Sequence, residues 1–524
     1  MIKEIITNLH NKYDSLVNNS IYKGIISAAF SLLLFCICAF AIYLRYKVYS
    51  ANLSMFCDEV SVLINLSSKS YSQLFLPLFE AQCTPPLFLV LYKFIYGLTG
   101  FNDTLLKLPI FLFSILNVLL FCYLTFSALK NRCSVIFANI VFALSQPVIY
   151  YCWILKQYQT DITCTILILI VAYKIKNENI SLKQIMFLSI ITAIFMLFSY
   201  TSVFIIGTTI ITLFLYKFFK KTLPDDFIKK FLIYAAIPFI TAIIFFVVNC
   251  LPTLQNNVLQ TYWDNNWFNM FFFPQTTVDW ANLIPFFTSG GLNISNYIAI
   301  CVILIISLLL MLLKDKFSLS LLSLPFITAA LLGYFHLYPF CPERVCLYLI
   351  PVGILIIAKL IDNADFKKVK LSFPVFLIII CSFYNYRTID YIIDDIINFK
   401  DKFFAYGGIM RTNSRDFAAF LNQSDISYKD YVVTDSFWAA HNVIKMYDKN
   451  NKINHDNIID SSNADSNIEQ LDALDKNSRI YFYISSKFSY FGWNIYLSDW
   501  IEQNCKIDST YEVNGGNVIK CIKK

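Results

Sequence analysis

Two adjacent acidic residues, Asp58 and Glu59, follow closely after the first long apolar segment of the chain. A charge beside hydrocarbon is costly in free energy unless water or a partner compensates it. Because the pair heads a loop with further polar residues, we expect both carboxylates to lie at an aqueous interface. There they can supply a general base for a reaction beside the membrane. The alternative is an interfacial helix start, where acidic side chains favour the positive end of the helix dipole.

A second polar segment, residues 150–161, lies between two apolar segments and carries two charges, Lys156 and Asp161. A helical ion pair needs a spacing of about three or four residues, and these two are further apart. Gln157 and Tyr158 lie between them and add hydrogen-bonding groups. The segment is therefore a candidate for binding a polar ligand. In the alternative, Lys156 snorkels to the interface and Asp161 caps a helix.

A third polar segment joins two late apolar segments and contains His336, Tyr338 and Arg344. Two prolines within it impose a rigid, extended turn. Since a guanidinium group offers a planar fork of hydrogen-bond donors, Arg344 is suited to binding a phosphate. In the alternative, Arg344 pairs with the neighbouring Glu343 or snorkels to lipid headgroups.

The composition places these polar segments in a membrane protein. The chain has 524 residues, of which 57% are hydrophobic and 15% charged, and its mean hydropathy is +0.58. A soluble protein carries about 25% charged residues. Several stretches reach the roughly 20 apolar residues that cross a bilayer. The first, Ile25 to Leu44, has no small-residue cleavage site after it and is expected to be an uncleaved signal anchor.

The apolar segments and the charges between them predict a polytopic helical protein of about 11–13 transmembrane helices. The clearest spans lie near residues 24–44, 104–127, 133–149, 162–175, 185–199, 201–217, 231–250, 293–313, 318–338, 345–360 and 371–386. Lysine and arginine gather in every second connection, which predicts a cytoplasmic N-terminus and an extracytoplasmic C-terminus. The three polar segments then share the extracytoplasmic side. Residues 85–98 are apolar but short, and are expected to be re-entrant or interfacial.

The chain is expected to form two domains. Residues 1–386 make up the transmembrane domain, whose extracytoplasmic loop 45–103 carries the acidic pair, and residues 387–524 make up a small extracytoplasmic α/β domain. Patterning in the second domain predicts strands at 430–434, 479–484 and 517–522 and helices at 417–421, 438–447 and 495–503. Cys505 and Cys521 in this domain either form a disulfide or remain free thiols.

Several classes of site are missing from the sequence. Neither GxGxxG nor GxxxxGK[ST] occurs, so we expect no loop for a soluble nucleotide. The four histidines, at positions 10, 336, 441 and 455, are scattered and do not indicate a metal cluster. The formal charge of +7 arises from lysines in short loops and does not predict nucleic-acid binding. We expect no required cofactor and leave a divalent metal ion open.

The polar motifs, taken in order, resemble those of a known family. They are Cys57-Asp58-Glu59, Thr84-Pro85-Pro86-Leu87-Phe88, Lys107-Leu108-Pro109, Ile149-Tyr150-Tyr151, Lys156-Gln157-Tyr158, Asp161, Phe198-Ser199-Tyr200-Thr201, Tyr338-Pro339-Phe340, Arg344 and Leu349-Ile350-Pro351. Over residues 20–390 the chain resembles the bacterial branch of the protein O-mannosyltransferase superfamily, which are membrane glycosyltransferases of the C-type fold. This group includes the aminoarabinose lipid A transferases and the rhizobial lipopolysaccharide transferases. The chain departs from the family where Lys107 replaces a common arginine and where Lys156-Gln157-Tyr158 replaces a Glu-x-Arg-x-Tyr form.

The resemblance implies a sugar donor carried on a polyprenyl phosphate and a cell-envelope acceptor, which is a lipid, a glycan or a protein. Asp58 is then the general base and Glu59 the second candidate, since an inverting displacement needs one base whereas retention needs a carboxylate nucleophile. Arg344 and Lys156 are expected to bind the donor phosphate. The side chains expected to bind the sugar or the acceptor are Asp161, Tyr158, Gln157, His336 and Tyr338. The implied location is the bacterial inner membrane, among membrane lipids.

A polytopic membrane protein can also be a transporter, a flippase or a membrane-anchored sensor. A transporter or flippase is the main alternative, but it would favour charges near the middle of spans and repeated halves with broken helices. The predicted spans are almost free of ionisable residues, and no two halves match. A membrane-anchored sensor would not need so many spans. The connection 251–292, with Trp263, Asp264, Trp267 and Trp280, either stacks on sugar rings or anchors at the interface.

Overall fold

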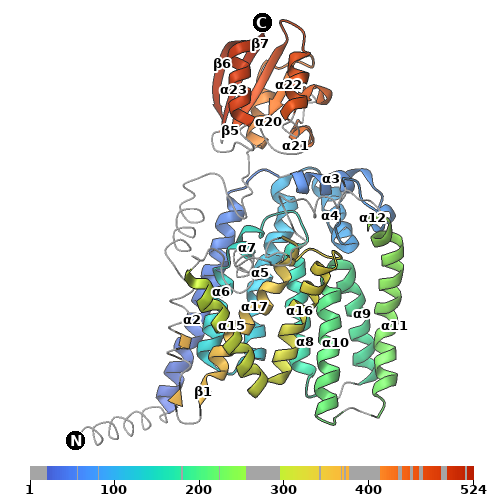
Figure 1. Ribbon diagram of the computed structural model, residues 1–524, viewed down its shortest axis with the longest axis vertical. Coiled ribbons are helices and arrows are strands. Elements are labelled where there is room, and N and C mark those ends of the chain that lie inside the picture. Colours follow the sequence, from blue (N-terminus) through green and yellow to red (C-terminus); the bar gives the residue numbers. More distant parts are fainter. Residues whose placement is uncertain are drawn as a thin grey trace, which may run out of the picture.

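The computed structural model has a bundle of long helices with a smaller sheet domain beyond one end (Figure 1). It describes residues 20–55, 57–80, 82–178, 181–222, 225–254, 295–340, 344–366, 369–370, 373, 375–376, 414–434, 440–448, 452–459, 464–485, 493–513 and 516–524. Most of the connection 251–292, including its tryptophans, lies outside these residues, as do most of the predicted span 371–386 and the predicted domain boundary at 386.

The bundle confirms the predicted multi-pass helical class. Its elements are α2 (Ser20–Ser50), α3 (Cys57–Ser68), η1 (Ser72–Phe75), α4 (Pro86–Thr99), α5 (Asp103–Ala128), α6 (Arg132–Ala143), α7 (Gln146–Tyr150), α8 (Tyr158–Ile175), α9 (Leu182–Phe198), α10 (Ser202–Phe219), α11 (Phe227–Phe245), η2 (Phe246–Cys250), α12 (Leu251–Leu254), α15 (Ser295–Lys314), α16 (Lys316–Tyr334), η4 (Arg344–Leu349) and α17 (Ile350–Asn363). Among the described residues, seven helical stretches are long and apolar enough to cross a membrane: α2, α5, α8, α10, α11 with its continuation, α16, and η4 with α17. The shorter apolar helices are α4, α6, α9 and the Cys301–Lys314 part of α15.

Capping side chains carried by the sequence set several helix starts. The Asn102 side chain accepts a hydrogen bond from the Leu105 N–H at 3.1 Å and opens α5. Asp315 does the same for Ser318 of α16, also at 3.1 Å, and Ser181 opens α9 with a capping box. Each of these caps satisfies backbone N–H groups that the helix itself leaves without a partner.

Two predicted spans need correction. The span expected at 133–149 is broken between α6 and α7, because Pro147 lacks a backbone N–H and is suited to a first helical turn. Helix α16 ends at Tyr334 instead of continuing to 338. The chain turns tightly there, and a Cβ atom on Gly333 would lie only 2.7 Å from the Cβ of Phe340. A side chain at position 333 would therefore push the turn open.

Helix α4 covers the short apolar segment 85–98. Its 14 residues extend over about 21 Å, less than the roughly 30 Å of a hydrocarbon core. Pro86 begins the helix, and Gly100, at a φ of 61°, ends it in a conformation that glycine adopts without strain. The helix packs against α3, η1 and α9. A re-entrant or interfacial position for α4 remains a prediction.

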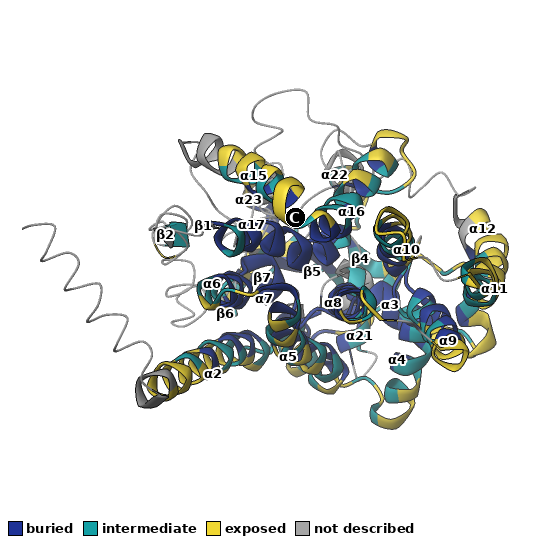
Figure 2. Ribbon diagram, turned by 90° about the horizontal axis from the view of Figure 1, so that it is seen from below, coloured by how far each residue is buried: buried dark blue, intermediate teal, exposed yellow. Residues whose placement is uncertain are grey.

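Helices α8 and α17 occupy the centre of the bundle, and α2 and α11 lie at its rim (Figure 2). Of the 20 residues of η4 and α17, 16 are buried, whereas Pro238 is the one buried residue of α11. Polar side chains on α8 and η4 are therefore held by packed neighbours. Helix α11 packs mainly on α9.

A buried ion cluster ties α17 to its neighbours at the end of the bundle away from the sheet domain. Lys359 Nζ lies 2.7 Å from Asp315 Oδ2 and 3.3 Å from Asp362 Oδ2, and it donates to the Ala128 carbonyl at 2.6 Å. Asp362 also accepts two backbone N–H groups from the α5–α6 connection. Burial acts to raise the pKa of Asp315, but Lys359 outweighs burial and lowers that pKa below its ordinary value.

Replacing Lys359 with Met is expected to lower the free energy of unfolding by about 3–5 kcal/mol, because two carboxylates lose their cation. Thermal unfolding of the full chain in detergent measures this change. The matched control is Lys183→Met, at an exposed lysine that opens α9, and its expected effect is within about 0.5 kcal/mol. Equal melting temperatures for the two variants would show that the cluster does not stabilise the bundle.

The C-terminal domain is a five-stranded sheet with four α-helices and one short 3-10 helix, η6 (His455–Asn457), among the described residues. Its elements are α20 (Ser414–Gln423), β3 (Tyr431–Thr434), α21 (Ala440–Tyr447), β4 (Ile458–Ile459), α22 (Ala464–Asp472), β5 (Arg479–Ser485), α23 (Trp493–Asn504), β6 (Cys505–Val513) and β7 (Gly516–Lys523). The strand order is β4-β3-β5-β7-β6, with β3 parallel to β4 and β5 and with β7 antiparallel to its two neighbours. The predicted strands are confirmed, and so are the predicted helices as far as they are described. Strands β4 and β6 and helix α22 are additions, and a two-stranded hairpin, β1 (Asp365–Phe366) and β2 (Val369–Lys370), follows α17.

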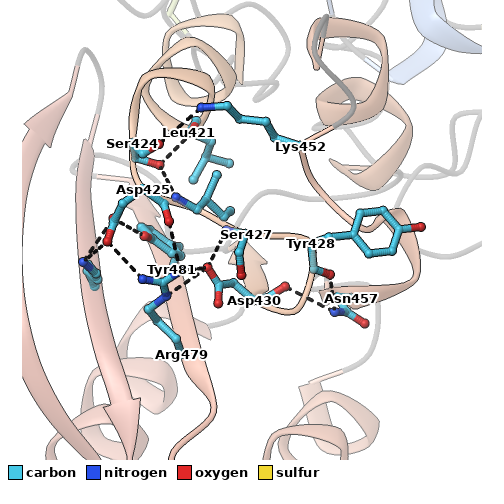
Figure 3. Close-up of polar contacts among 12 residues, drawn as sticks. Leu421, Ser424, Asp425, Ser427, Tyr428, Asp430, Lys452, Asn457, Arg479 and Tyr481 are labelled. Atoms are coloured by element: carbon cyan, nitrogen blue, oxygen red, sulfur yellow. Dashed lines mark hydrogen bonds and ion pairs between the residues drawn. The ribbon is translucent and has the colours of Figure 1, made fainter.

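The loop before β3 is fastened to the sheet by a network around Asp425 (Figure 3). Asp425 accepts hydrogen bonds from Tyr481 at 2.7 Å, Arg479 at 3.0 Å and Lys520 at 2.9 Å. The bond from Lys520, followed by that from Tyr481, lowers the pKa of Asp425 to about 2. Arg479 is shared with Asp430, at 2.6 Å. Lys520 also lies 3.2 Å from Asp508, so two basic side chains are shared among three carboxylates, which suits a structural role.

Cys505 and Cys521 lie on the adjacent strands β6 and β7 and are free, buried thiols. The hydrogen bond between them lowers the pKa of Cys505 and raises that of Cys521. Of the two states that the sequence left open, the structure has the free thiols.

Candidate active site

Asp58 and Glu59 occupy the first turn of α3, at the end of the bundle that faces the sheet domain (Figure 1). This is the helix start that the sequence offered as an alternative, and the helix dipole favours both carboxylates there. Their surroundings differ. The Asp58 side chain is 32% exposed, whereas Glu59 is fully buried. The expectation that both carboxylates lie in an aqueous environment is therefore wrong for Glu59.

Arg344 joins Asp58 at this end of the bundle. Its Nη1 lies 3.2 Å from Asp58 Oδ2, and the arginine side chain is only 11% exposed. The two residues are 286 positions apart in the chain. Arg344 begins η4 with a φ of 35°, an unusual value for a residue with a side chain, and such strain is common at functional sites. The alternative partner Glu343 lies outside the described residues.

Glu59 is fastened to the second polar segment. Its carboxylate accepts a hydrogen bond from the Leu155 backbone N–H at 2.8 Å. This bond connects the start of α3 to the turn that precedes α8. The contact gives Glu59 a positioning role, whereas Asp58 keeps access to solvent.

Three side chains from other polar segments hydrogen-bond to the segment 82–84. Lys156 Nζ bonds to the Gln82 side chain, Gln157 Nε2 donates to the Cys83 carbonyl at 3.3 Å, and Tyr200 OH donates to the Thr84 carbonyl at 2.9 Å. The structure thus brings together three motifs that are far apart in the chain. Lys156 is buried, and its ammonium group contacts this segment. Its expected role at a donor phosphate therefore remains a prediction.

Asp161 lies on the first turn of α8 and is nearly fully buried, with the Ser199 and Thr201 hydroxyl groups hydrogen-bonded to its carboxylate. Four buried oxygen atoms on the segments that meet here have no hydrogen-bond partner among the described residues: Asp161 Oδ1, Gln157 Oε1, Thr84 Oγ1 and Tyr348 OH. Buried polar groups without partners are rare in folded proteins because each one costs free energy. This set is therefore suited to a ligand that brings several hydroxyl groups.

Three further predicted residues have different surroundings. Tyr338 donates its hydroxyl to the Val345 carbonyl at 3.0 Å and so supports the turn before η4; burial raises its pKa well above the ordinary value. Tyr158 packs against Tyr151, with ring centroids 5.0 Å apart. His336 is exposed at a left-handed position, with a φ of 55°. None of these contacts assigns a ligand to the three residues, and their predicted roles remain predictions.

Lys107 supports the backbone that leads to Asp58. It is almost fully buried, donates to the Leu53 carbonyl at 2.6 Å and lies 4.4 Å from the centroid of the Trp153 ring. This is a position where the sequence departs from the family pattern. The lysine retains a positive charge there but without the fork of an arginine.

The C-terminal domain docks on the same stretch of backbone, which the sequence did not predict. Tyr447 OH accepts the Met55 N–H at 2.9 Å and donates to Asp103 Oδ2 at 3.0 Å. Arg415 lies 2.8 Å from the same carboxylate oxygen and also bonds to the Asn52 carbonyl. Burial, followed by the charge of Asp103, raises the pKa of Tyr447. These contacts fix residues 52–55 immediately before α3.

Replacing Arg415 with Met is expected to weaken docking of the C-terminal domain by about 1.5–3 kcal/mol, because Asp103 loses a charged hydrogen bond. Hydrogen–deuterium exchange of the full chain measures the effect as faster exchange in residues 50–57. The control is Lys429→Met, at an exposed lysine of the same domain. If exchange in residues 50–57 is the same in both variants, the Arg415 contact does not hold this segment.

Metal ligands do not cluster in the part of the chain that the structure describes, where no group of three or more His, Cys, Asp or Glu side chains could hold an ion.

The residues that the sequence missed are Thr84, Ser199, Thr201, Tyr348, Asp103, Arg415 and Tyr447. The first three belong to motifs that carry the family resemblance, so a signal for them existed. The sequence has no local signal for the others.

Comparison with known proteins gives structural neighbours only. No family model matches the chain, and no curated protein matches it in sequence. ArnT from Cupriavidus metallidurans, in the apo state, aligns over 94% of this chain and 98% of its own with a TM-score of 0.49 and 9% identity. Its form bound to undecaprenyl phosphate aligns over 93% and 97%, with a TM-score of 0.48 and 10% identity. The Archaeoglobus fulgidus oligosaccharyltransferase, in complex with zinc and sulfate, aligns over 93% and 72%, with a TM-score of 0.45 and 12% identity.

Proposed function

We propose that this chain is an integral-membrane glycosyltransferase that moves a sugar from a polyprenyl-phosphate donor to a cell-envelope lipid, glycan or protein. The observation that carries the proposal is the ion pair between Asp58 and Arg344. A partly exposed carboxylate and a guanidinium group, held together at one end of an apolar bundle, supply a base and a phosphate-binding cation. The family resemblance of the motifs that contain them supports the same reaction.

The reaction can be written with named atoms. An acceptor hydroxyl attacks the anomeric carbon of the donor sugar, and the bond from that carbon to the phosphate oxygen breaks. The acceptor proton passes to the Asp58 carboxylate. The departing polyprenyl phosphate gains a negative charge, which Arg344 neutralises through its planar donors. Before the donor binds, Arg344 is paired with Asp58.

An inverting single displacement is the stereochemical course that these surroundings favour. Retention through a covalent intermediate needs a second carboxylate as nucleophile. Glu59 is fully buried and fixed to the Leu155 N–H, so it is poorly placed to attack a substrate. Asp58 then acts as the one base, and we infer that the anomeric configuration changes on transfer.

We infer that the sugar binds among the buried oxygen atoms of Asp161, Gln157, Thr84 and Tyr348. A pyranose or furanose ring has several hydroxyl donors that would satisfy them, and the gain for each bond is about 0.5–1.5 kcal/mol. Acceptor oxygens of this kind reject analogues that lack the matching hydroxyl. Lys156 remains a candidate for a second phosphate contact.

The test uses the purified full chain in lipid, with labelled polyprenyl-phosphate sugars and a panel of cell-envelope acceptors. The proposal predicts a labelled product with at least one donor and no product from the corresponding soluble nucleotide sugars. A transporter would instead accumulate a solute inside proteoliposomes without forming a glycosyl bond. Uptake without any product across the panel would overturn the proposal.

A further inference from the structure

A cavity lies among four helices of the bundle. It has a volume of about 190 Å³, is lined by α8, α9, α10 and α11, and is partly open to the surroundings of the bundle. Its walls are mainly aliphatic and aromatic, with Ile168, Phe195, Ile206 and Leu213 as examples. Asp161 lies one and a half to two turns of α8 away from Ile168, or about 10 Å along the helix axis. One end of the cavity, at Phe195, therefore adjoins the candidate active site through the hydrogen bond from the Ser199 N–H to the Phe195 carbonyl, and the cavity runs from there along α8 and α10 away from that site.

One end of this cavity is basic. Lys217 and Lys230 both contribute to its lining. Lys217 Nζ donates to the Glu178 carbonyl at 2.8 Å, and Lys230 Nζ lies 3.1 Å from Asp226. Each contact uses one of the three N–H donors of an ammonium group. The stretch 217–230 contains five lysines against two aspartates, so the mouth of the cavity attracts an anion.

The helices around the cavity are held together unevenly. Helix α11 is fastened to α9, where Ser189 donates to the Tyr234 carbonyl at 2.7 Å and Thr192 bonds to the Tyr234 hydroxyl at 2.8 Å. Helix α9 has few contacts with α8 and α10, and the cavity separates the α9–α11 pair from them. A void with apolar walls loses dispersion contacts on every side. Inside a bilayer, the neighbouring molecule that can fill such a void is a lipid.

We propose that this cavity binds one acyl chain of an anionic glycerophospholipid, whose phosphate lies between Lys217 and Lys230. A cavity of roughly 150 Å³ takes a benzene ring, so this one takes a short stretch of hydrocarbon chain. The two lysines select a negatively charged headgroup over a zwitterionic one. The basic stretch also marks the cytoplasmic side by the positive-inside rule, where anionic lipids attract lysines. The lipid joins the α9–α11 pair to the rest of the bundle.

The occupant differs from the proposed sugar donor. A donor phosphate must reach Arg344, at the end of the bundle that faces the C-terminal domain. The end of α10 and the start of α11, which carry Lys217 and Lys230, lie at the opposite end of the bundle (Figure 1). The phospholipid site does not depend on the proposed transfer reaction. A protein with no glycosyltransferase activity would still show it.

Native mass spectrometry of the delipidated full chain, with dioleoyl phosphatidylglycerol or dioleoyl phosphatidylcholine added back, tests the site. We expect the first bound phosphatidylglycerol to bind about tenfold more tightly than phosphatidylcholine, since each lysine near a membrane surface favours an anionic lipid. The double variant Lys217→Ala/Lys230→Ala should lose this preference. The matched control, Lys220→Ala/Lys221→Ala, removes two exposed lysines of the same stretch that do not line the cavity, and should keep it.

A second variant tests the apolar part of the site. Leu213→Trp places a larger side chain in the cavity and should weaken phosphatidylglycerol binding about fivefold or more, with an unchanged melting temperature in detergent as evidence of folding. Equal affinities for the two lipids in the wild type would overturn the proposal. An equal loss of the lipid preference in the two double lysine variants would overturn it as well. A preference for undecaprenyl phosphate over phosphatidylglycerol would also overturn it, and would assign the cavity to the polyprenyl lipid.

Discussion

Replacing Asp58 with Asn is expected to lower the rate of sugar transfer by about a hundred- to ten-thousand-fold, the usual contribution of a general base. Asparagine has nearly the same shape but cannot accept the acceptor proton. Glu59 cannot take its place because it is fully buried and bound to the Leu155 N–H. The rate at saturating donor is the quantity to measure, together with the melting temperature of the variant.

The matched control for this variant is Glu80→Gln, which removes an exposed carboxylate from the same connection between α2 and α5. It should transfer sugar at the wild-type rate. Wild-type activity in Asp58→Asn would exclude Asp58 as the base. A large loss in Glu80→Gln as well would indicate that the loop responds to charge in general, without a specific base.

Replacing Arg344 with Met is expected to slow transfer by about a hundred- to thousand-fold, because the departing phosphate loses its preorganised donors. The loss should appear in kcat as well as in the KM for the donor, since the phosphate gains charge only as the bond breaks. Arg344→Lys keeps the charge but not the planar fork, so an intermediate loss is expected. Steady-state kinetics with varied donor concentration separate these effects.

The control for Arg344 is Arg132→Met, an exposed arginine at the start of α6. It should leave both constants unchanged. A double variant of Asp58 and Arg344 adds a further test, because residues in direct contact are not additive. Wild-type kinetics in Arg344→Met would separate this residue from the donor phosphate.

The meeting of Asp58 and Arg344 was predictable in part from the sequence. The alternation of lysine-rich connections places both residues on the same side of the membrane, and the family motifs contain both. What the pattern could not provide is their contact, since 286 positions separate them. That contact depends on tertiary packing, in which η4 lies against α8 and α17.

Asp58 and Glu59 differ in burial for a geometric reason, which the prediction of a loop at this position did not include. Neighbouring residues on a helix point about 100° apart. Once α3 starts at Cys57, one carboxylate faces the open end of the bundle and the other faces its core. A loop would have let both reach water.

The docking of the C-terminal domain had no signal in the sequence. Asp103, Arg415 and Tyr447 meet across more than 300 positions, and each is an ordinary polar residue in its own segment. The broken span at 133–149 did have a signal, because Pro147 lies inside it. A prediction based on hydropathy alone gave more weight to the apolar residues around Pro147 than to the proline, and so placed one continuous span there.

Transfer from a lipid-linked donor at the Asp58–Arg344 pair can be measured directly. The experiment follows labelled sugar and free polyprenyl phosphate together, in liposomes that contain the purified chain, a donor and an acceptor. We expect equal amounts of glycosylated acceptor and polyprenyl phosphate with the wild type, and neither above background with Asp58→Asn. Equal product formation by the wild type and Asp58→Asn would contradict this expectation, and so would donor breakdown that does not depend on the acceptor.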